Sequence, residues 1–390
     1  MRTRLLLAGL SALVGVSVEV EAQSYRDLMF IRGMPSAYST VLQTRAGVLG
    51  GVAGEEAEAF GLENTTAWDG HIYYHQDRFG GRDSVLDAYA GRDGGYFGVT
   101  EGEMLGQQTQ SRLEFSTRYF PFYRDGHYRG DDFIPTGRYE GSDYAVRLTV
   151  AREIAPGWRM EIGGFYRRLM FERNEDTALN YVIPEDYDAY GGVTFIENNT
   201  LVLDRVTGRP DHGFIATLAV EQEFNDSSGT LGIPGVFESS LPSSVWRGRG
   251  HLQWYMPQSQ STTWEVKVDA SMTDDRDRVH NHDAQKPIGH TWVDGSLGFR
   301  VEMGLAFWLT PYAKGQLVKI LDSSGLGTDQ KLFYGGGLSM GYDAASNLTF
   351  LLDYSYLSNE SREPVSATAD TYGEHRFFVG LNVRFGAARK

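Results

Sequence analysis

Apolar residues alternate with polar or small ones along much of this 390-residue chain. The clearest example is close to the C-terminus, where every second position is apolar: Phe377, Val379, Leu381, Val383 and Phe385. Period-two alternation places successive side chains on opposite faces of an extended backbone. The pattern therefore predicts β-strands that have one apolar face and one more polar face.

The same alternation marks eleven further segments. They are 111–123, 143–154, 158–171, 190–206, 212–224, 244–257, 262–273, 290–305, 308–321, 331–343 and 348–358. Most run to about 10–15 residues, whereas strands of soluble proteins have about five or six and membrane-crossing strands need about 9–11. Aromatic residues such as Trp158, Trp264 and Tyr342 lie near segment ends, as the two interfacial girdles of a membrane barrel require.

The connections between these segments alternate between tight and long. The tight ones are 155–157, 258–261 and 344–347, and the long, polar ones are 124–142, 225–243, 274–289, 322–330 and 359–373. Short turns at one end and long loops at the other are typical of outer-membrane barrels.

On these features the chain resembles bacterial outer-membrane β-barrel proteins. The segment from Phe377 to Phe385 resembles the aromatic-ended last strand that such proteins present to the barrel-assembly machinery, although here Gly386–Lys390 follow it. The resemblance implies an all-β, antiparallel, up-and-down transmembrane barrel in the bacterial outer membrane, with lipid and the assembly machinery as partners.

The strand directions give a count. If the last strand descends into the periplasm, 158–171 and 212–224 both rise, so a descending strand must separate them. Segment 190–206 fills that place, with a turn at 208–210, and the total is twelve. A further hairpin within 69–100 would make fourteen, and even numbers are usual for bacterial barrels. We therefore expect about 12–14 strands within 68–390, preceded by a luminal or periplasmic lead-in over 23–67.

The N-terminus has the layout of a secretory signal peptide. Arg2 and Arg4 precede an apolar stretch, and small residues stand at Val20 and Ala22. This arrangement predicts cleavage after Ala22 and export of the mature chain.

Composition narrows the possible functions. The absence of Cys excludes a disulfide scaffold, a thiolate metal site and a lipid-anchored lipoprotein. A formal net charge of −15 argues against nucleic acid as a partner.

If the apolar face meets lipid, the other face lines the lumen with charges of both signs. The pore-lining candidates are Arg147, Arg159, Arg247, Arg249, His251, Glu265, Lys267, Asp269, Arg300 and Glu302. Two interpretations stay open: a passive porin-like channel for small hydrophilic solutes, and a closed barrel that acts as a surface scaffold or adhesin through its long loops. An open pore should leave some luminal charges unpaired, whereas a closed barrel should pair them all.

One basic row stands out within this set. Arg247, Arg249 and His251 lie on one strand at intervals of about 7 Å. The next strand presents Glu265 and Asp269 within reach of cross-strand pairing. In an open pore the basic row should attract anions.

No catalytic residue, cofactor or metal site is predicted. The loop 274–283 carries carboxylates and imidazoles, but its spacing matches no rigid cation site. An outer-membrane hydrolase is a third possibility, for which His71, His75 and the Asp211–His212 pair would be the candidates. Their spacing identifies no triad, because triads are defined by geometry.

Overall fold

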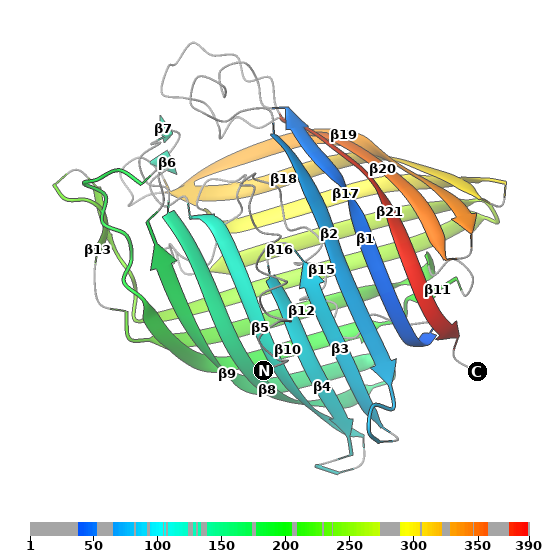
Figure 1. Cartoon of the computed structure of the whole chain (residues 1–390), viewed down its shortest axis with the longest axis horizontal. Helices are drawn as coiled ribbons and strands as arrows, with labels where there is room; N and C mark the ends of the chain where they lie inside the picture. The colour runs from blue at the N-terminus through cyan, green and yellow to red at the C-terminus, as the bar shows by residue number, and fades with distance from the viewer. Residues whose placement is uncertain are drawn as a thin grey trace, which may run out of the picture.

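The computed structural model describes residues 38–52, 65–81, 83–91, 94–103, 105–106, 108–123, 128–129, 132–133, 139–173, 177–204, 209–227, 230–235, 237–273, 289–304, 306–321, 328–345, 347–357 and 374–388. Within these ranges, sixteen long antiparallel strands form one closed barrel (Figure 1). The first strand, β1, pairs with both its successor β2 and the last strand, β21, so the sheet has no free edge. No helix long and apolar enough to cross a membrane occurs in the described part of the chain.

The barrel strands follow one another in chain order. They are β1 (Tyr38–Val52), β2 (Thr65–Asp77), β3 (Ser84–Gly91), β4 (Gly94–Gly102), β5 (Thr109–Tyr123), β8 (Tyr139–Ala155), β9 (Trp158–Glu172), β10 (Tyr187–Asn199), β12 (Pro210–Asn225), β15 (Ser244–Ser259), β16 (Thr262–Thr273), β17 (Gly289–Met303), β18 (Phe307–Leu321), β19 (Thr328–Ala345), β20 (Leu348–Leu357) and β21 (Glu374–Ala388). Five short strands lie in the connections: β6 (Tyr128–Arg129), β7 (Asp132–Phe133), β11 (Val202–Leu203), β13 (Thr230–Ile233) and β14 (Phe237–Ser240).

The all-β, antiparallel, up-and-down architecture is the one predicted from the sequence. The strand count is higher than the expected 12–14, because the structure adds β1, β2, β3 and β4 to the twelve predicted segments. β1 lies inside 23–67, so a barrel that begins at 68 starts too late. The predicted signal peptide and the rest of the expected lead-in, 23–37 and 53–64, lie outside the described residues.

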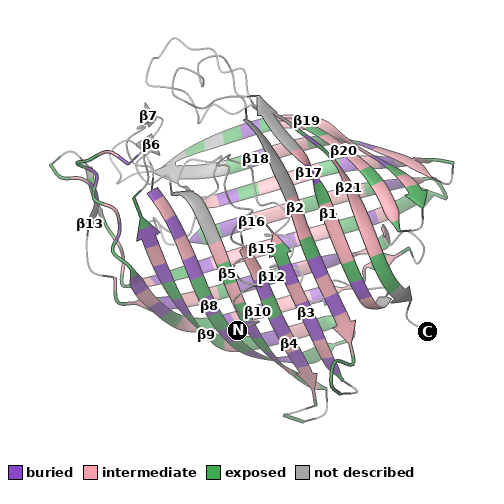
Figure 2. Ribbon diagram, in the orientation of Figure 1, coloured by how far each residue is buried: buried purple, intermediate pink, exposed green. Residues whose placement is uncertain are grey.

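The predicted apolar rows face outward. Along β8 the exposed side chains Tyr144, Val146 and Leu148 alternate with the buried Ala145 and Arg147, and Figure 2 shows this banding over the barrel. An apolar residue exposed on the outside of a closed barrel is stable only against lipid. The outer surface is therefore a membrane-facing one.

Exposed aromatic residues bracket the apolar band. Trp158 and Tyr166 stand on the outer face of β9, eight residues apart, which is about 26 Å along the strand. At a strand tilt of about 40°, the height along the barrel axis is about 20 Å, close to the apolar band of known barrels.

One connection and the end of the last strand differ from the sequence prediction. The turn expected at 208–210 is part of a short hairpin, because β10 ends at Asn199 and β11 pairs with the first residues of β12. The last strand also continues past Phe385, since Gly386 pairs with Val41 of β1. The tail after Phe385 is thus partly a component of the barrel seam.

Candidate functional site

The barrel lumen holds the candidate site, because the ten predicted pore-lining residues all stand on the inner rows of their strands. These rows alternate with the exposed apolar rows described above. Their environments differ widely, however. Arg147, Arg247 and Arg300 are buried, whereas Lys267 is exposed. The inner surface therefore consists of a closely packed part and a more accessible part.

The packed part begins with an ion-pair chain across β2, β3, β5 and β8. The His75 Nδ1 lies 2.6 Å from Asp87 Oδ1, and Arg112 Nη1 lies 3.2 Å from Asp87 Oδ2. Arg112 Nε then contacts Glu114 Oε2 at 3.2 Å, and Arg147 Nη1 contacts Glu114 Oε1 at 2.9 Å. Each of these five side chains is buried. Alternation of sign along the chain compensates the cost of removing the charges from water.

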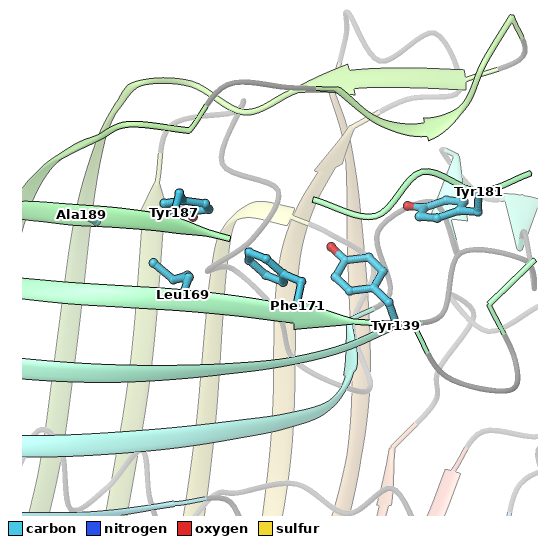
Figure 3. Packing of buried hydrophobic residues seen from close by; sticks show 6 residues of the cluster. All are labelled: Tyr139, Leu169, Phe171, Tyr181, Tyr187 and Ala189. Atoms are coloured by element: carbon cyan, nitrogen blue, oxygen red, sulfur yellow. The ribbon is translucent and has the colours of Figure 1, made fainter. Parts of the chain in front are cut away.

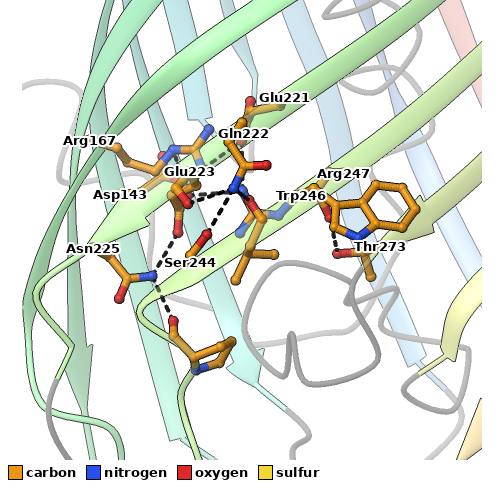
Figure 4. Close-up of polar contacts among 12 residues, drawn as sticks. Asp143, Arg167, Glu221, Gln222, Glu223, Asn225, Ser244, Trp246, Arg247 and Thr273 are labelled. Atoms are coloured by element: carbon orange, nitrogen blue, oxygen red, sulfur yellow. Dashed lines mark hydrogen bonds and ion pairs between the residues drawn. The ribbon is translucent and has the colours of Figure 1, made fainter.

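A second cluster joins β9, β12 and β15, as Figure 4 shows. Arg247 Nη1 lies 2.7 Å from Glu221 Oε1 and 2.9 Å from Glu223 Oε2. Arg167 Nη1 lies 3.5 Å and 3.1 Å from the same two oxygens. Glu223 is fully buried, and Asn225 Nδ2 donates a hydrogen bond of 3.2 Å to its other oxygen.

The partner of Arg247 differs from the sequence prediction. We expected acids on β16, but the register sets Arg247 opposite Thr273 on that side and opposite Glu221 of β12 on the other. His251 does meet its predicted neighbour Asp269, at 2.6 Å from Nδ1 to Oδ1. Because Arg247 is held by two buried acids, it is a structural part of this wall as well as a luminal charge.

The accessible part follows the inner face of β16 and β17. Lys267 is exposed in the middle of β16, and the side chains of Asp269 and Glu302 are 31% and 33% exposed. Arg300 on β17 is buried and contacts Glu265 at 3.3 Å. Exposed charges on the inner row of a closed barrel require water in the lumen beside them.

An apolar cluster occupies the inner face at the loop end of β8, β9 and β10. The side chains that project inward from these strands are Tyr139, Leu169, Phe171 and Tyr187. Tyr181, in the loop between β9 and β10, packs against them (Figure 3). Arg173 Nη1 donates a hydrogen bond of 2.6 Å to the carbonyl of Tyr181 and holds the loop in place. The sequence assigned Tyr139 to a polar loop, so this cluster was not predicted.

Alternation-based reasoning also missed an aromatic inner wall on β2, β3 and β4. Tyr73, Tyr89 and Tyr96 are buried there, and the rings of Tyr89 and Tyr96 stack 5.9 Å apart. The Tyr73 hydroxyl donates to Asp87 at 2.9 Å. Inward aromatic residues make the two faces of a strand more alike in hydrophobicity, which weakens the alternation of apolar and polar residues in the sequence.

The three histidine positions considered for hydrolysis do not form a triad among the described residues. Both ring nitrogens of His75 are occupied by carboxylates, Asp87 at 2.6 Å and Asp77 at 3.0 Å, so neither is placed to activate a nucleophile. His71 contacts the Tyr89 ring, and His212 forms an exposed pair with Asp211.

A search for metal ligands within the described residues finds no group of three or more His, Asp or Glu that could hold an ion. The loop 274–283, which carries the carboxylates and imidazoles noted in the sequence, lies outside those residues.

Comparison with known proteins identifies the fold. BamA from Haemophilus ducreyi, in a structure lacking POTRA domains 1–3, matches with a TM-score of 0.51 and 12% identity over 89% of this chain and 70% of that one. CdiB from Acinetobacter baumannii matches with a TM-score of 0.52 and 8% identity over 88% of this chain and 60% of that one. CdiB from Escherichia coli matches with a TM-score of 0.50 and 10% identity over 90% of this chain and 64% of that one.

No protein-family model and no curated protein matches the sequence. At these identities the structural likeness concerns the fold, and the fold is that of bacterial outer-membrane β-barrels.

Proposed function

We propose that this protein is a passive outer-membrane channel for small hydrophilic solutes. The observation that carries the proposal is the exposed Lys267 on the inner face of β16, about halfway along the strand. A lysine in this position is stable only if water fills the adjacent part of the lumen. Barrels of sixteen to eighteen strands also have a circumference large enough for an aqueous channel.

The path runs along β16 and β17 and not through the whole cross-section. The buried clusters around Glu114 and Glu223 occupy other parts of the inner wall, and the Glu223 cluster extends to β15, which borders β16. Asp269 and Glu302 border the accessible side with negative charge, and Lys267 adds positive charge. Mixed charges suit polar solutes and exclude apolar ones, since apolar solutes gain nothing from displacing water there.

Outer-membrane residence is part of the same proposal. The exposed outer rows require lipid, and the predicted signal peptide would carry the chain across the inner membrane before assembly. Within this proposal, the last strand from Phe377 to Phe385 acts as the assembly signal, and Phe385 is exposed on the outer face.

Cysteine accessibility tests the channel directly, because the native chain has no Cys. The variant Lys267→Cys is refolded into a planar bilayer and treated with a small sulfonated thiol reagent. We expect the reagent to change the single-channel current, because the added sulfonate replaces a luminal cation by an anion. The matched control is Val266→Cys, the neighbouring residue on the lipid-facing row, which should leave the current unaltered.

A second candidate is a closed barrel that serves as a surface scaffold. The ordered loop at Tyr181 favours it, because this loop and the hairpin β13–β14 form a folded surface at the loop end, joined by the bridge between Val182 and Gly232. Wild-type protein that is folded in bilayers, passes no ions and leaves Lys267→Cys unmodified would exclude the channel and favour the scaffold.

A further inference from the structure

The short hairpin between β10 and β12 extends across the turn end of the lumen. β11 pairs with β12 through Val202 opposite His212, and Asp204 N donates to the carbonyl of Arg209 at 2.8 Å. The pairing of β10 with β9 extends only to Asn198, and the pairing of β12 with β15 begins at Gly213, so the ladder between β11 and the start of β12 lies beyond the paired wall. Figure 1 shows β11 at the same end of the barrel as the C-terminus.

Arg209 attaches the hairpin to a distant part of the barrel. Its Nη1 lies 2.9 Å from Asp343 Oδ2 on β19, and its Nη2 lies 3.6 Å from Glu302 Oε1 on β17. The guanidinium also lies over the ring of Trp308 on β18, 5.8 Å from the ring centroid. Arg300 of β17 adds a fourth contact, since its Nη2 donates to the carbonyl of Pro210 at 2.7 Å.

These contacts require the hairpin backbone to extend inward. With strands about 4.8 Å apart and tilted by about 40°, sixteen strands enclose a barrel about 32 Å wide. β12 and β19 are five strand spacings apart, so the straight line between them is about 27 Å. One Arg and one Asp side chain cannot bridge that distance. Arg209 lies four residues from Gly213, and an extended arm of that length adds about 13 Å, which together with the two side chains makes the contact possible.

A glycine marks the point where the hairpin leaves the wall. Gly213 has a φ of +93°, and a Cβ at this position would lie 2.2 Å from the carbonyl oxygen of Thr200. From Gly213 onward β12 pairs with β15 in regular register. Only glycine combines that conformation with that close approach, so the direction of the hairpin is built into the backbone.

We propose that this hairpin forms the turn-end constriction of the lumen, and that Arg209 sets its width by holding the hairpin against β17, β18 and β19. The inference rests on the proposed channel function. Lys267 and Glu302 lie on the wall against which the hairpin is held, so a solute that follows this wall meets the hairpin at the turn end and must pass beside it. The constriction therefore limits which solutes pass by size, and Arg209, Glu302 and Asp343 place charge of both signs at it.

The test compares single-channel conductance of Arg209→Ala with wild type in planar bilayers. Loss of the three Arg209 contacts leaves the hydrogen bond from Arg300 to Pro210 as the remaining contact described above. The hairpin should then move away from β18 and β19, and conductance should rise by about two-fold or more as the path widens. Exclusion of neutral polymers of graded size should shift toward larger polymers. Arg209→Lys, which retains a cation for Asp343, should restore most of the wild-type conductance.

Two further variants test whether a change in conductance comes from the hairpin. Arg152→Ala removes an exposed arginine near the turn end of β8, on the outer row, and should leave conductance unaltered. Gly213→Val redirects the hairpin from its base, and it should increase conductance as Arg209→Ala does. Heat-modifiable migration on gels establishes that each variant is folded.

The outcomes separate this inference from the channel proposal. If wild type conducts and Arg209→Ala has the same conductance and polymer cut-off, the constriction is wrong and the channel stands. If wild type is silent and Arg209→Ala conducts, the hairpin closes the lumen and the inference is supported. If all folded variants are silent, both are overturned.

Discussion

Arg247→Ser is the substitution for which the structure gives the sharpest expectation. In the sequence, Arg247 belongs to a basic row that should attract anions if the lumen is open. In the structure, Arg247 is buried and lies 2.7 Å from Glu221 and 2.9 Å from Glu223. Its removal therefore leaves two buried carboxylates with one fewer cation.

The size of the loss in stability depends on the cation that remains beside Glu221 and Glu223. Removing one partner of a buried ion pair costs about 3–5 kcal/mol, because the other charge stays buried. Arg167 still lies 3.1 Å from Glu223 and 3.5 Å from Glu221, which compensates part of the loss. We therefore expect a decrease of about 3 kcal/mol in the free energy of unfolding.

Urea unfolding from liposomes, followed by tryptophan fluorescence, measures this quantity. With an m-value of about 2 kcal/mol per molar urea, the midpoint should fall by about 1–2 M. Arg168→Ser is the matched control, since Arg168 pairs with Asp188 at 3.1 Å on the exposed outer face, where an ion pair is worth at most about 1 kcal/mol.

A double-mutant cycle with Glu223→Gln identifies the cause. Neutralising Glu223 in the Arg247→Ser background should recover part of the stability, because one of the stranded charges is removed, and the coupling should be about 1–3 kcal/mol. Equal midpoints for Arg247→Ser and wild type, or losses that simply add in the double variant, would refute the reasoning from buried charge.

Three further predictions concern the outer face, the loop end and assembly. Val266→Arg should lower the free energy of unfolding in liposomes by about 2–4 kcal/mol. Lys267→Glu, on the adjacent inner row, should alter it by less than about 0.5 kcal/mol. Similar losses for the two variants would contradict the assignment of inner and outer rows. Tyr181→Ala should expose its loop to limited proteolysis while the barrel stays heat-modifiable, because a side chain that is 2% exposed leaves a cavity; unchanged cleavage would contradict that packing. Phe385→Ala should reduce folded protein in outer membranes, and deletion of 389–390 should not; the opposite result would place the signal elsewhere.

The twelve strands predicted from the sequence were recognisable because lipid and lumen impose opposite demands on alternate residues. On β8 the outer row is Tyr144, Val146, Leu148 and Val150, and the inner row includes Arg147 and Thr149. The contrast between rows makes the period visible, and the alternation of tight turns and long loops supports it.

The four strands beyond the predicted twelve lack this contrast, and the sequence indicated only a further hairpin within 69–100 among them. In β2, β3 and β4 the inner row contains Tyr73, Tyr89 and Tyr96 beside polar residues, so the contrast between the two faces is reduced. In β1 the glycines at Gly47, Gly50 and Gly51 leave few side chains from which to read a period. The membership of these four strands in the barrel is evident only from the strand pairing, which runs from β21 through β1, β2, β3 and β4 to β5.

The faces of the strands were predictable from the sequence, because a side-chain period of two is a property of the extended backbone. It did not determine partners, since those depend on the register between strands. Arg247 illustrates the difference: its inward direction was predictable, but its pairing with Glu221 depends on the alignment of β12 with β15. The contacts of Arg209 with Asp343 and Glu302 depend on the curvature of the barrel and on the inward course of the hairpin. Together these bring a turn beside β12 within reach of strands that lie more than ninety residues further along the chain.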